Sequence, residues 1–133
     1  MDYPVSCTIG LGSNAPDREA QINRAIDFLR GYLSKCSVSS IYESAAINGT
    51  DSSYLNAVVH GRSSVNSSTL VRHLKDFEKA MGRNQESKEK GVVPIDLDLV
   101  IYDMRILRPK DFERHYFNIG YRELLANGSF QDE

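Results

Sequence analysis

The sequence predicts an α+β fold, and three observations lead to it. Short stretches alternate apolar and polar residues with the period of two that is typical of β-strands. Two longer stretches repeat apolar residues every three or four positions, so each forms a helix with one apolar face. In the order β-α-β-β-α-β, both helices can cover one face of a four-stranded antiparallel sheet. The predicted architecture is the ferredoxin-like arrangement, and it leaves the other sheet face for loops and ligands.

Length and charge limit the classes of function. The 133 residues carry a formal net charge of −2, and we expect residues 1–126 to form a single domain and residues 127–133 a frayed tail. This balance gives no electrostatic reason to expect nucleic-acid binding. No apolar stretch reaches the length of about 18 residues that a membrane-spanning helix needs. The start of the chain lacks a basic secretory signal, and two cysteines fit a reduced protein, so we expect a cytoplasmic location.

The first strand is predicted at Val5–Gly12 and the first helix at Arg18–Ser34, with Asp17 as its N-cap. Between them lies the sequence G-L-G-S-N, at Gly10–Asn14. A glycine-rich turn before a helix can cradle phosphate, but this one matches neither a Walker A motif nor a full G-x-G-x-x-G motif. A tight strand-to-helix turn is the favoured interpretation. The apolar face of the helix consists of Ile22, Ile26, Leu29 and Leu33.

A second strand at Ser37–Glu43 is followed by a long polar loop, Ser44–Ser53, which is either a binding loop or a segment without function. The third strand is predicted at Tyr54–Arg62. Tyr54 and Asn56 lie two residues apart and so share one face of this strand. They could bind a flat heterocycle by stacking and hydrogen bonding, or be ordinary strand residues.

The second helix is predicted at Ser67–Met81, with Ser67 as its N-cap and Gly82 just beyond its end. The charged segment Arg83–Lys90 follows and leads into the next strand. It is either a solvated loop or a lid that carries cations over a polyphosphate.

The stretch Gly91–Tyr102 contains the last long strand of the predicted sheet. Asp96 and Asp98 project from one face together with Val100 and Tyr102, while leucine and isoleucine side chains enter the core. Two adjacent carboxylates repel each other unless a cation or water separates them. Paired carboxylates combined with phosphate commonly hold Mg²⁺, whereas the alternative is a solvated edge strand.

Beyond this strand, Ile106–Leu107 forms a candidate short strand, and Asn118–Leu125 a candidate short helix. Lys110, Arg114 and His115 make a basic cluster between them. The imidazole of His115 could protonate a bridging or leaving oxygen, or only donate a hydrogen bond to it.

Four motifs occur in an order that resembles a known family: G-S-N at residues 12–14, Y-L-N-A at 54–57, G-R at 82–83 and G-x-x-x-I-D-L-D-L at 91–99. Together they resemble the 6-hydroxymethyl-7,8-dihydropterin pyrophosphokinase family of folate biosynthesis, over about residues 8–121. The resemblance implies transfer of pyrophosphate from ATP to the pterin with two Mg²⁺ ions, and other folate-pathway enzymes as partners.

The resemblance also implies roles for single residues. Asp96 and Asp98 would be the metal ligands, and Arg83 would act with them in catalysis. Ser44, Tyr54, Asn56 and Tyr121 would bind the pterin, with the ring of Tyr121 closing one side. Glu78, Arg83, Lys110 and His115 would contact ATP. The segments Ser44–Ser53 and Arg83–Lys90 would be the mobile loops that close over substrate.

The chain departs from the family pattern where arginines are expected. The positions concerned hold Gln85, the pair Val92 and Val93, and Ile119. Loss of several cations beside a transferring phosphoryl group slows catalysis unless other lysines replace them. One alternative is therefore a catalytically impaired pterin- or nucleotide-binding module of the same fold. Another is an interaction domain in which the carboxylates are incidental.

Overall fold

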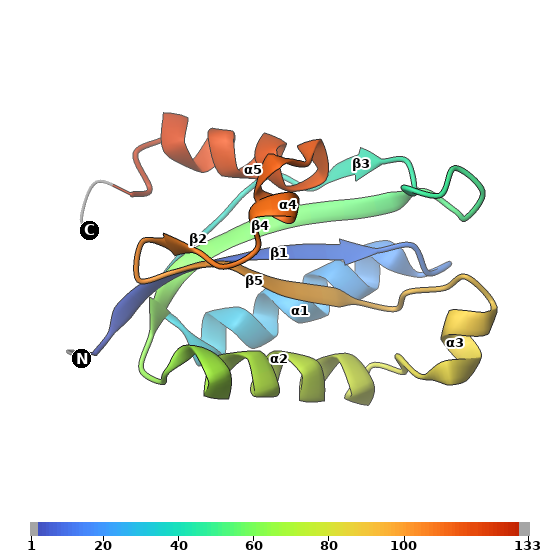
Figure 1. The fold of residues 1–133 in the computed structure, drawn as a ribbon, viewed down its shortest axis with the longest axis horizontal. Helices are drawn as coiled ribbons and strands as arrows, with labels where there is room; N and C mark the ends of the chain where they lie inside the picture. Colours follow the sequence, from blue (N-terminus) through green and yellow to red (C-terminus); the bar gives the residue numbers. More distant parts are fainter. Residues whose placement is uncertain (1–2, 131–133) are drawn as a thin grey trace.

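The computed structural model describes residues 3–130, and over this range it confirms the α+β class. One antiparallel sheet has the strand order β2-β4-β1-β5-β6, and β3 also pairs with β4. Helices α1 and α2 cover one face of the sheet, whereas α4 and α5 lie over the other (Figure 1). The strands are β1 Val5–Ser13, β2 Ser34–Val38, β3 Tyr42–Ser44, β4 Tyr54–Ser63, β5 Asp96–Tyr102 and β6 Arg105–Ile106. The helices are α1 Arg18–Tyr32, α2 Ser67–Ala80, α3 Gln85–Glu89, α4 Pro109–Glu113 and α5 His115–Ala126.

Within residues 3–130 the sheet has six strands, whereas the predicted sheet had four, and there are five helices. The candidate short strand at Ile106–Leu107 overlaps β6, and the candidate short helix at Asn118–Leu125 lies within α5. The unpredicted strand β3 contains three residues, too few to give an alternating pattern. The strand predicted at Ser37–Glu43 is interrupted at Ser39. There the backbone N–H donates to Val58 O at 2.9 Å, but the Ser39 hydroxyl, not its carbonyl, accepts from Val58 N at 2.8 Å. Because the side-chain hydroxyl takes the place of the backbone carbonyl, the chain leaves the hydrogen-bonding pattern of β2 and β4 at Ser39 and begins β3 at Tyr42.

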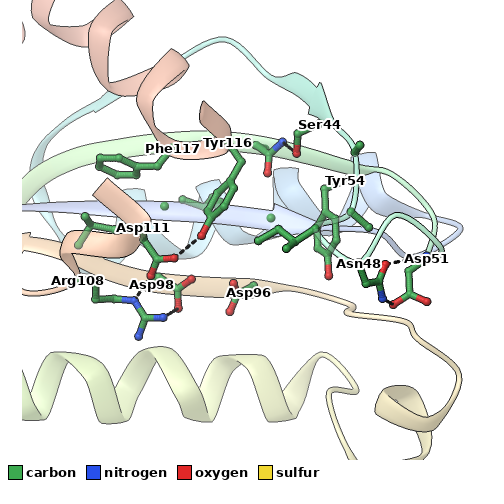
Figure 2. Close-up of a pocket in the computed structure, with 18 residues that line it drawn as sticks. Ser44, Asn48, Asp51, Tyr54, Asp96, Asp98, Arg108, Asp111, Tyr116 and Phe117 are labelled. Atoms are coloured by element: carbon green, nitrogen blue, oxygen red, sulfur yellow. Dashed lines mark hydrogen bonds and ion pairs between the residues drawn. The ribbon is translucent and has the colours of Figure 1, made fainter. Parts of the chain in front are cut away.

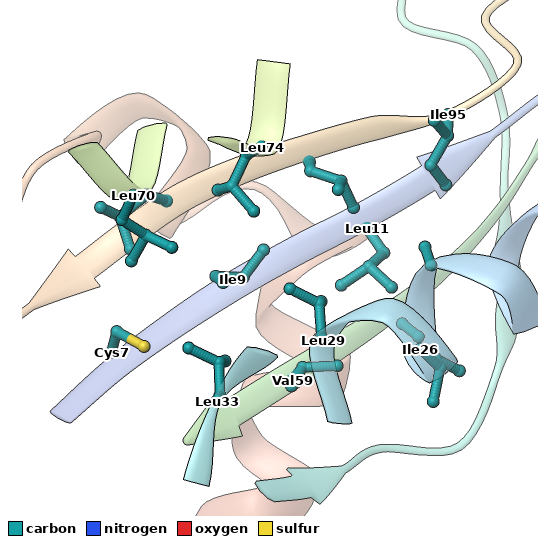
Figure 3. Close-up of a cluster of buried hydrophobic side chains, with 14 of the residues drawn as sticks. Cys7, Ile9, Leu11, Ile26, Leu29, Leu33, Val59, Leu70, Leu74 and Ile95 are labelled. Carbon is teal, nitrogen blue, oxygen red and sulfur yellow. The ribbon is translucent and has the colours of Figure 1, made fainter. Parts of the chain in front are cut away.

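The main hydrophobic core lies between the sheet and helices α1 and α2 (Figure 3). The four apolar residues predicted for the first helix face it and are all buried, from Ile22 to Leu33. Ile9 of β1 and Leu74 of α2 are fully buried in the same layer. Each fully buried aliphatic side chain stabilises the fold by about 1.5–3 kcal/mol, so this layer fixes both helices on the sheet.

A register shift in β5 changes which side chains share the face of Asp98. The pairing of β5 with β1 shifts between Thr8 and Ile9, which places Val100 between two paired residues. After this bulge the alternation is reversed. Val100 belongs to a small cluster under α5, whereas Tyr102 lies in the main core. The prediction that Tyr102 shares the carboxylate face was therefore wrong.

The helix ends differ in detail from the prediction. Asp17 is at the N-cap position of α1 as predicted, although its side chain makes no capping hydrogen bond. The N-cap of α2 is Asn66 rather than Ser67, and its side chain accepts from Thr69 N at 2.8 Å. An amide oxygen one residue earlier thus satisfies a free N–H of the first turn. The charged segment after α2 contains the short helix α3.

The C-terminal helix α5 packs on β4 through a glycine. A Cβ atom built on Gly120 would lie 2.6 Å from Val58 Cγ2 and 2.9 Å from Ser39 Oγ, so only glycine allows this approach. Of the predicted tail, residues 131–133 lie outside the described part. Phe130 is described, and its ring packs edge-on against His60. None of the helices within residues 3–130 is both long and apolar enough to cross a membrane.

Gly120→Ala should destabilise the protein by about 1–3 kcal/mol, because the new methyl group must push α5 away from β4. The free energy of unfolding in urea measures the effect. Gly31→Ala is the matched control, since a Cβ there meets nothing within 4 Å and Gly31 lies inside α1. It should stabilise by about 0.5–1 kcal/mol. Equal stability of both variants would contradict the packing described for α5.

Candidate active site

A cavity of about 420 Å³ lies on the sheet face opposite α1 and α2 (Figure 2). Its floor is the middle of the sheet. Tyr54 of β4 lies at one end, and Tyr116 and Phe117 of α5 lie at the other. Asp96 and Asp98 of β5 form one wall. The loop between β3 and β4 contributes the rim, including Ile47, whose side chain is 70% exposed.

Two glycines of β1 keep the cavity open. A Cβ on Gly10 would lie 3.2 Å from a ring carbon of Phe117, and one on Gly12 would lie 3.4 Å from the Tyr54 ring. Both glycines lie inside β1, which continues to Ser13. The G-x-G sequence is therefore not a strand-to-helix turn. The two glycines leave one face of β1 without side chains at these positions, and the cavity lies over that face.

The pairing of β1 aligns the two walls. Gly12 is opposite Asn56 of β4 on one side and opposite Asp96 of β5 on the other. Gly10 is likewise opposite Asp98. Tyr54 and Asn56 thus share a face with the carboxylates, as the alternation predicted.

Asn56 and Ser44 form a polar end of the cavity. The Asn56 side chain is buried and donates to Ser44 Oγ at 2.8 Å and to Tyr42 O at 3.2 Å. Because the Ser44 hydroxyl accepts this hydrogen bond, its own proton can be donated to a ligand. This pair can therefore recognise the polar edge of a heterocycle.

Asp96 and Asp98 form a coupled pair. Burial raises the pKa of Asp98 to about 8, together with the charge of Asp96 and the hydrogen bond between them, against the opposing charges of Lys75 and Arg108. Burial also raises the pKa of Asp96, but the hydrogen bond with Asp98 and the ion pair with Arg83 outweigh it and leave that pKa below its usual value. At neutral pH the pair therefore shares one proton.

Cations surround this pair. Arg83 Nη1 lies 2.8 Å from Asp96 Oδ1, Lys75 Nζ lies 3.5 Å from Asp98 Oδ1, and Arg108 Nη2 lies 3.8 Å from the same oxygen. Arg108 Nε also donates to Asp111, and the other oxygen of Asp111 accepts from the Tyr116 hydroxyl.

Glu78, predicted to contact ATP, has a structural position instead of lining the cavity. It is 4% exposed. Its Oε2 accepts from Leu97 N at 2.7 Å and from Lys75 Nζ at 3.0 Å, and its Oε1 lies 3.0 Å from Arg83 Nη1. The Glu78 carboxylate thus links α2 to β5 and orients two cations toward the carboxylate pair.

Asn14 holds the two predicted loops together. Its amide donates to Gly91 O at 2.9 Å and to Ser52 O at 3.4 Å, and its side-chain oxygen accepts from Val93 N at 2.6 Å. Gly91 has φ +68°, and a Cβ there would lie 2.5 Å from a carboxylate oxygen of Asp51. The loop before β4 and the loop before β5 therefore meet beside the cavity.

The structure gathers half of the ten predicted site residues around the cavity: Ser44, Tyr54, Asn56, Asp96 and Asp98. Arg83 and Glu78 lie behind the carboxylates. Lys110 and His115 are exposed on α4 and at the start of α5, and neither lines the cavity. Tyr121 is one turn beyond Phe117 on α5, and its ring stacks on Phe117 at a centroid distance of 5.5 Å, outside the cavity lining.

Sequence reasoning missed five site residues: Lys75, Arg108, Asp111, Tyr116 and Phe117. Phe117 carried a usable signal, because it lies seven residues before Leu124 on one face of α5. Lys75 and Arg108 carried none, since only the packing of α2 and of the segment before α4 brings them to Asp98.

Comparison with known proteins is consistent with a small-molecule site of this kind. The family model described as 7,8-dihydro-6-hydroxymethylpterin-pyrophosphokinase matches residues 8–126. A 2-amino-4-hydroxy-6-hydroxymethyldihydropteridine pyrophosphokinase of Aquifex aeolicus is 34% identical over 103 residues, which cover 77% of this chain and 64% of the relative. The enzyme of the same name from Bacillus subtilis is 32% identical over 98 residues, which cover 71% and 58%. A folate synthesis bifunctional protein of Arabidopsis thaliana is 33% identical over 96 residues, which cover 71% and 20%.

The fold and the site define an α+β protein whose sheet carries a cavity with aromatic ends beside a carboxylate pair. The chain belongs to the 7,8-dihydro-6-hydroxymethylpterin-pyrophosphokinase family. The resemblance drawn from the four motifs is thereby confirmed. The matched segments of the two pyrophosphokinase relatives amount to 64% and 58% of their length, so the chain spans less than two thirds of either.

The raised pKa of Asp98 predicts a stability that falls with pH. The folded state keeps a proton that the unfolded chain releases near pH 4, so this contribution is complete below about pH 4. It is lost as the pH rises toward about 8. Asparagine does not titrate, so the free energy of unfolding of Asp98→Asn should lack this decrease between about pH 4 and pH 8. At pH 8 the variant should be more stable than wild type by about 1 kcal/mol or more.

Thermal unfolding of the metal-free protein between pH 5 and pH 8.5 measures this difference. Asp76→Asn, which changes an exposed carboxylate on α2, is the control and should follow the wild-type profile. Parallel profiles for Asp98→Asn and wild type would show that the two carboxylates do not share a proton.

Proposed function

We propose that this chain transfers pyrophosphate from ATP to the hydroxymethyl group of 6-hydroxymethyl-7,8-dihydropterin. The observation that carries the proposal is the alignment across β1 of a heterocycle-binding wall at Asn56 with a carboxylate pair at Asp96 and Asp98. Family membership supports this reaction. The name of the Arabidopsis relative, a folate synthesis bifunctional protein, supports folate-pathway enzymes as partners.

The carboxylate pair fits Mg²⁺ that arrives with a nucleotide. Within residues 3–130, no group of three or more His, Cys, Asp or Glu side chains is placed to hold a metal ion. Mg²⁺ usually takes one or two carboxylates and completes its octahedron with phosphate oxygens and water, so the donor set at Asp96 and Asp98 matches this mode. Two bound ions would neutralise charge on the phosphates in an in-line displacement.

The pterin fits the aromatic cavity. Tyr54 and Tyr116 provide aromatic rings at its two ends, and the Ser44–Asn56 pair provides hydrogen-bonding groups for the polar edge of the ring system. This arrangement directs the hydroxymethyl group toward β5, because the carboxylates form the adjoining wall.

The purine ring of the nucleotide is assigned to a second, smaller cavity of about 140 Å³ on the other side of Asp98. Apolar side chains line it, among them Val71, Leu74 and Leu107, and so do Lys75 and Arg108. A purine ring there would place its phosphates beside the carboxylate pair. Asp98 and Arg108 line both cavities, so the two substrates would meet at these residues.

In the proposed reaction the hydroxymethyl oxygen attacks the β-phosphorus of ATP, and the bond from this phosphorus to the α-phosphate oxygen breaks. AMP leaves, and the hydroxyl proton is released. The chain contributes position and charge: stacking and hydrogen bonds hold the acceptor, and Arg83 faces Asp96 as a cation for the phosphates.

Wild type should form AMP from ATP only when Mg²⁺ and the hydroxymethyl pterin are both present. Asp96→Asn and Asp98→Asn should each lower the rate by about 100-fold or more, because each removes a ligand and charge at the transferring group. Asp76→Asn should retain wild-type activity. Chromatographic measurement of AMP tests this. Pterin binding without AMP formation would instead identify the impaired binding module.

Tyr116→Leu should weaken binding of 6-hydroxymethylpterin by about 5- to 10-fold, because it removes a partly exposed aromatic ring that lines the cavity and keeps an apolar side chain there. Tyr121→Leu, which changes a ring outside the cavity lining, should leave the dissociation constant unchanged. Calorimetric titration measures the dissociation constant of each variant for 6-hydroxymethylpterin, and melting temperatures check that both variants fold. A loss confined to Tyr121→Leu would support the assignment made from the family resemblance and contradict that made from the structure.

A further inference from the structure

Lys75 and Arg108 each face Asp98, and each is also held by a second partner. Their nitrogens lie 3.5 Å and 3.8 Å from Asp98 Oδ1. Both distances exceed the 2.7–3.2 Å of an ordinary N–H···O hydrogen bond, so these contacts are loose ion pairs. They stay in place because other groups position the cations.

The ammonium group of Lys75 has two of its three protons engaged. One is donated to Glu78 Oε2 at 3.0 Å and another to Leu97 O at 3.1 Å. These anchors are a buried carboxylate and a strand carbonyl, so they fix the nitrogen relative to β5. The third proton is left on the side of Asp98, and the side chain is 39% exposed.

Arg108 is anchored in a comparable way from the opposite side. Its Nε donates to Asp111, which also accepts from the Tyr116 hydroxyl. The two terminal nitrogens of the guanidinium take no part in this bond to Asp111, and the side chain is 49% exposed. A guanidinium with its Nε engaged still offers a pair of donors that suits two phosphate oxygens.

We propose that Lys75 and Arg108 are phosphate-binding residues that exchange partners. Without a divalent cation they balance the negative charge of the Asp96–Asp98 pair, and when the cation occupies this pair they turn to the phosphates of the nucleotide. The inference rests on the proposed use of ATP and Mg²⁺. It assigns to this chain a phosphate clamp made of Lys75, Arg83 and Arg108.

Electrostatics give the direction of the exchange. A divalent cation bound by Asp98 repels the two cations, which lie within 4 Å of the same oxygen. The anchors on Glu78 and Asp111 keep them at the boundary between the two cavities. The phosphates brought by the nucleotide are then the nearest anions for both side chains.

The experiment measures binding of an uncleavable ATP analogue with a methylene group between its α- and β-phosphorus atoms, by calorimetry with and without Mg²⁺. With Mg²⁺, Lys75→Gln and Arg108→Gln should each weaken binding by about 10-fold or more, because each removes a charged hydrogen bond. Lys79→Gln on α2 and Arg105→Gln in β6 are matched controls, since both side chains are exposed and neither lines a cavity. They should bind as wild type does.

A double-mutant cycle without Mg²⁺ tests the exchange itself. At pH 9, where both carboxylates are ionised, Asp98→Asn should strengthen metal-free binding of the analogue, because it releases both cations. In the Lys75→Gln/Arg108→Gln background, the same change should give little of this gain. If the gain persists in that background, it comes only from removal of a negative charge, and the exchange is overturned.

The outcomes separate the inference from the proposed function. Wild type that binds the analogue with Mg²⁺, while both glutamine variants bind equally well, overturns the phosphate clamp but leaves ATP as substrate. Wild type that does not bind the analogue at all overturns both. Glutamine keeps hydrogen-bond donors near Glu78 and Asp111, and melting temperatures check the fold. Should Lys75→Gln unfold, the half-exposed Arg108 carries the test alone.

Discussion

The position of the whole site depends on one buried carboxylate. Glu78 on α2 accepts a hydrogen bond from the backbone N–H of Leu97, between the two site aspartates, and its charge is balanced by Lys75 and Arg83. A buried carboxylate is costly unless it is paired and hydrogen-bonded, so this arrangement tolerates little displacement of α2 along β5. The same contacts orient two cations toward the aspartates. A helix on the core side of the sheet thereby determines the electrostatics of the opposite side.

The two faces of the sheet are built on different physical principles. The face under α1 and α2 is filled with large aliphatic side chains and supplies most of the buried apolar area. The opposite face relies on small residues: Gly10 and Gly12 make room for rings and ligand, and Gly120 lets α5 approach β4 closely. Its apolar cluster is small, consisting of Val58, Val100, Phe117 and Leu124 with partly buried neighbours. Space that a larger core would have filled is available to a ligand.

The sequence was informative wherever one element alone determined the outcome. The alternation in β4 and β5 placed Asn56 and Asp96 on one face, and helical spacing identified the buried face of α1. It failed where the outcome depended on contacts between distant segments. The bulge at Val100 reverses the alternation and is set by the register with β1. The hydroxyl of Ser39 ends β2 through a bond to β4. The rings of α5 that line the cavity are those of Tyr116 and Phe117 rather than Tyr121, and this depends on how α5 packs on β4 at Gly120. Lys75 and Arg108 reach Asp98 only through tertiary packing.

Asn56 of β4 and Asp96 of β5 are both opposite Gly12 of β1, so they stand in one row across three hydrogen-bonded strands. Neighbouring strands are separated by about 4.7–4.9 Å, which places the two backbone positions roughly 9–10 Å apart. Hydrogen bonding of the sheet maintains this interval whatever the loops do. Under the proposed function, this fixed interval favours a ring whose reactive oxygen is one short linker away, because a longer arm would place that oxygen out of register with the carboxylates.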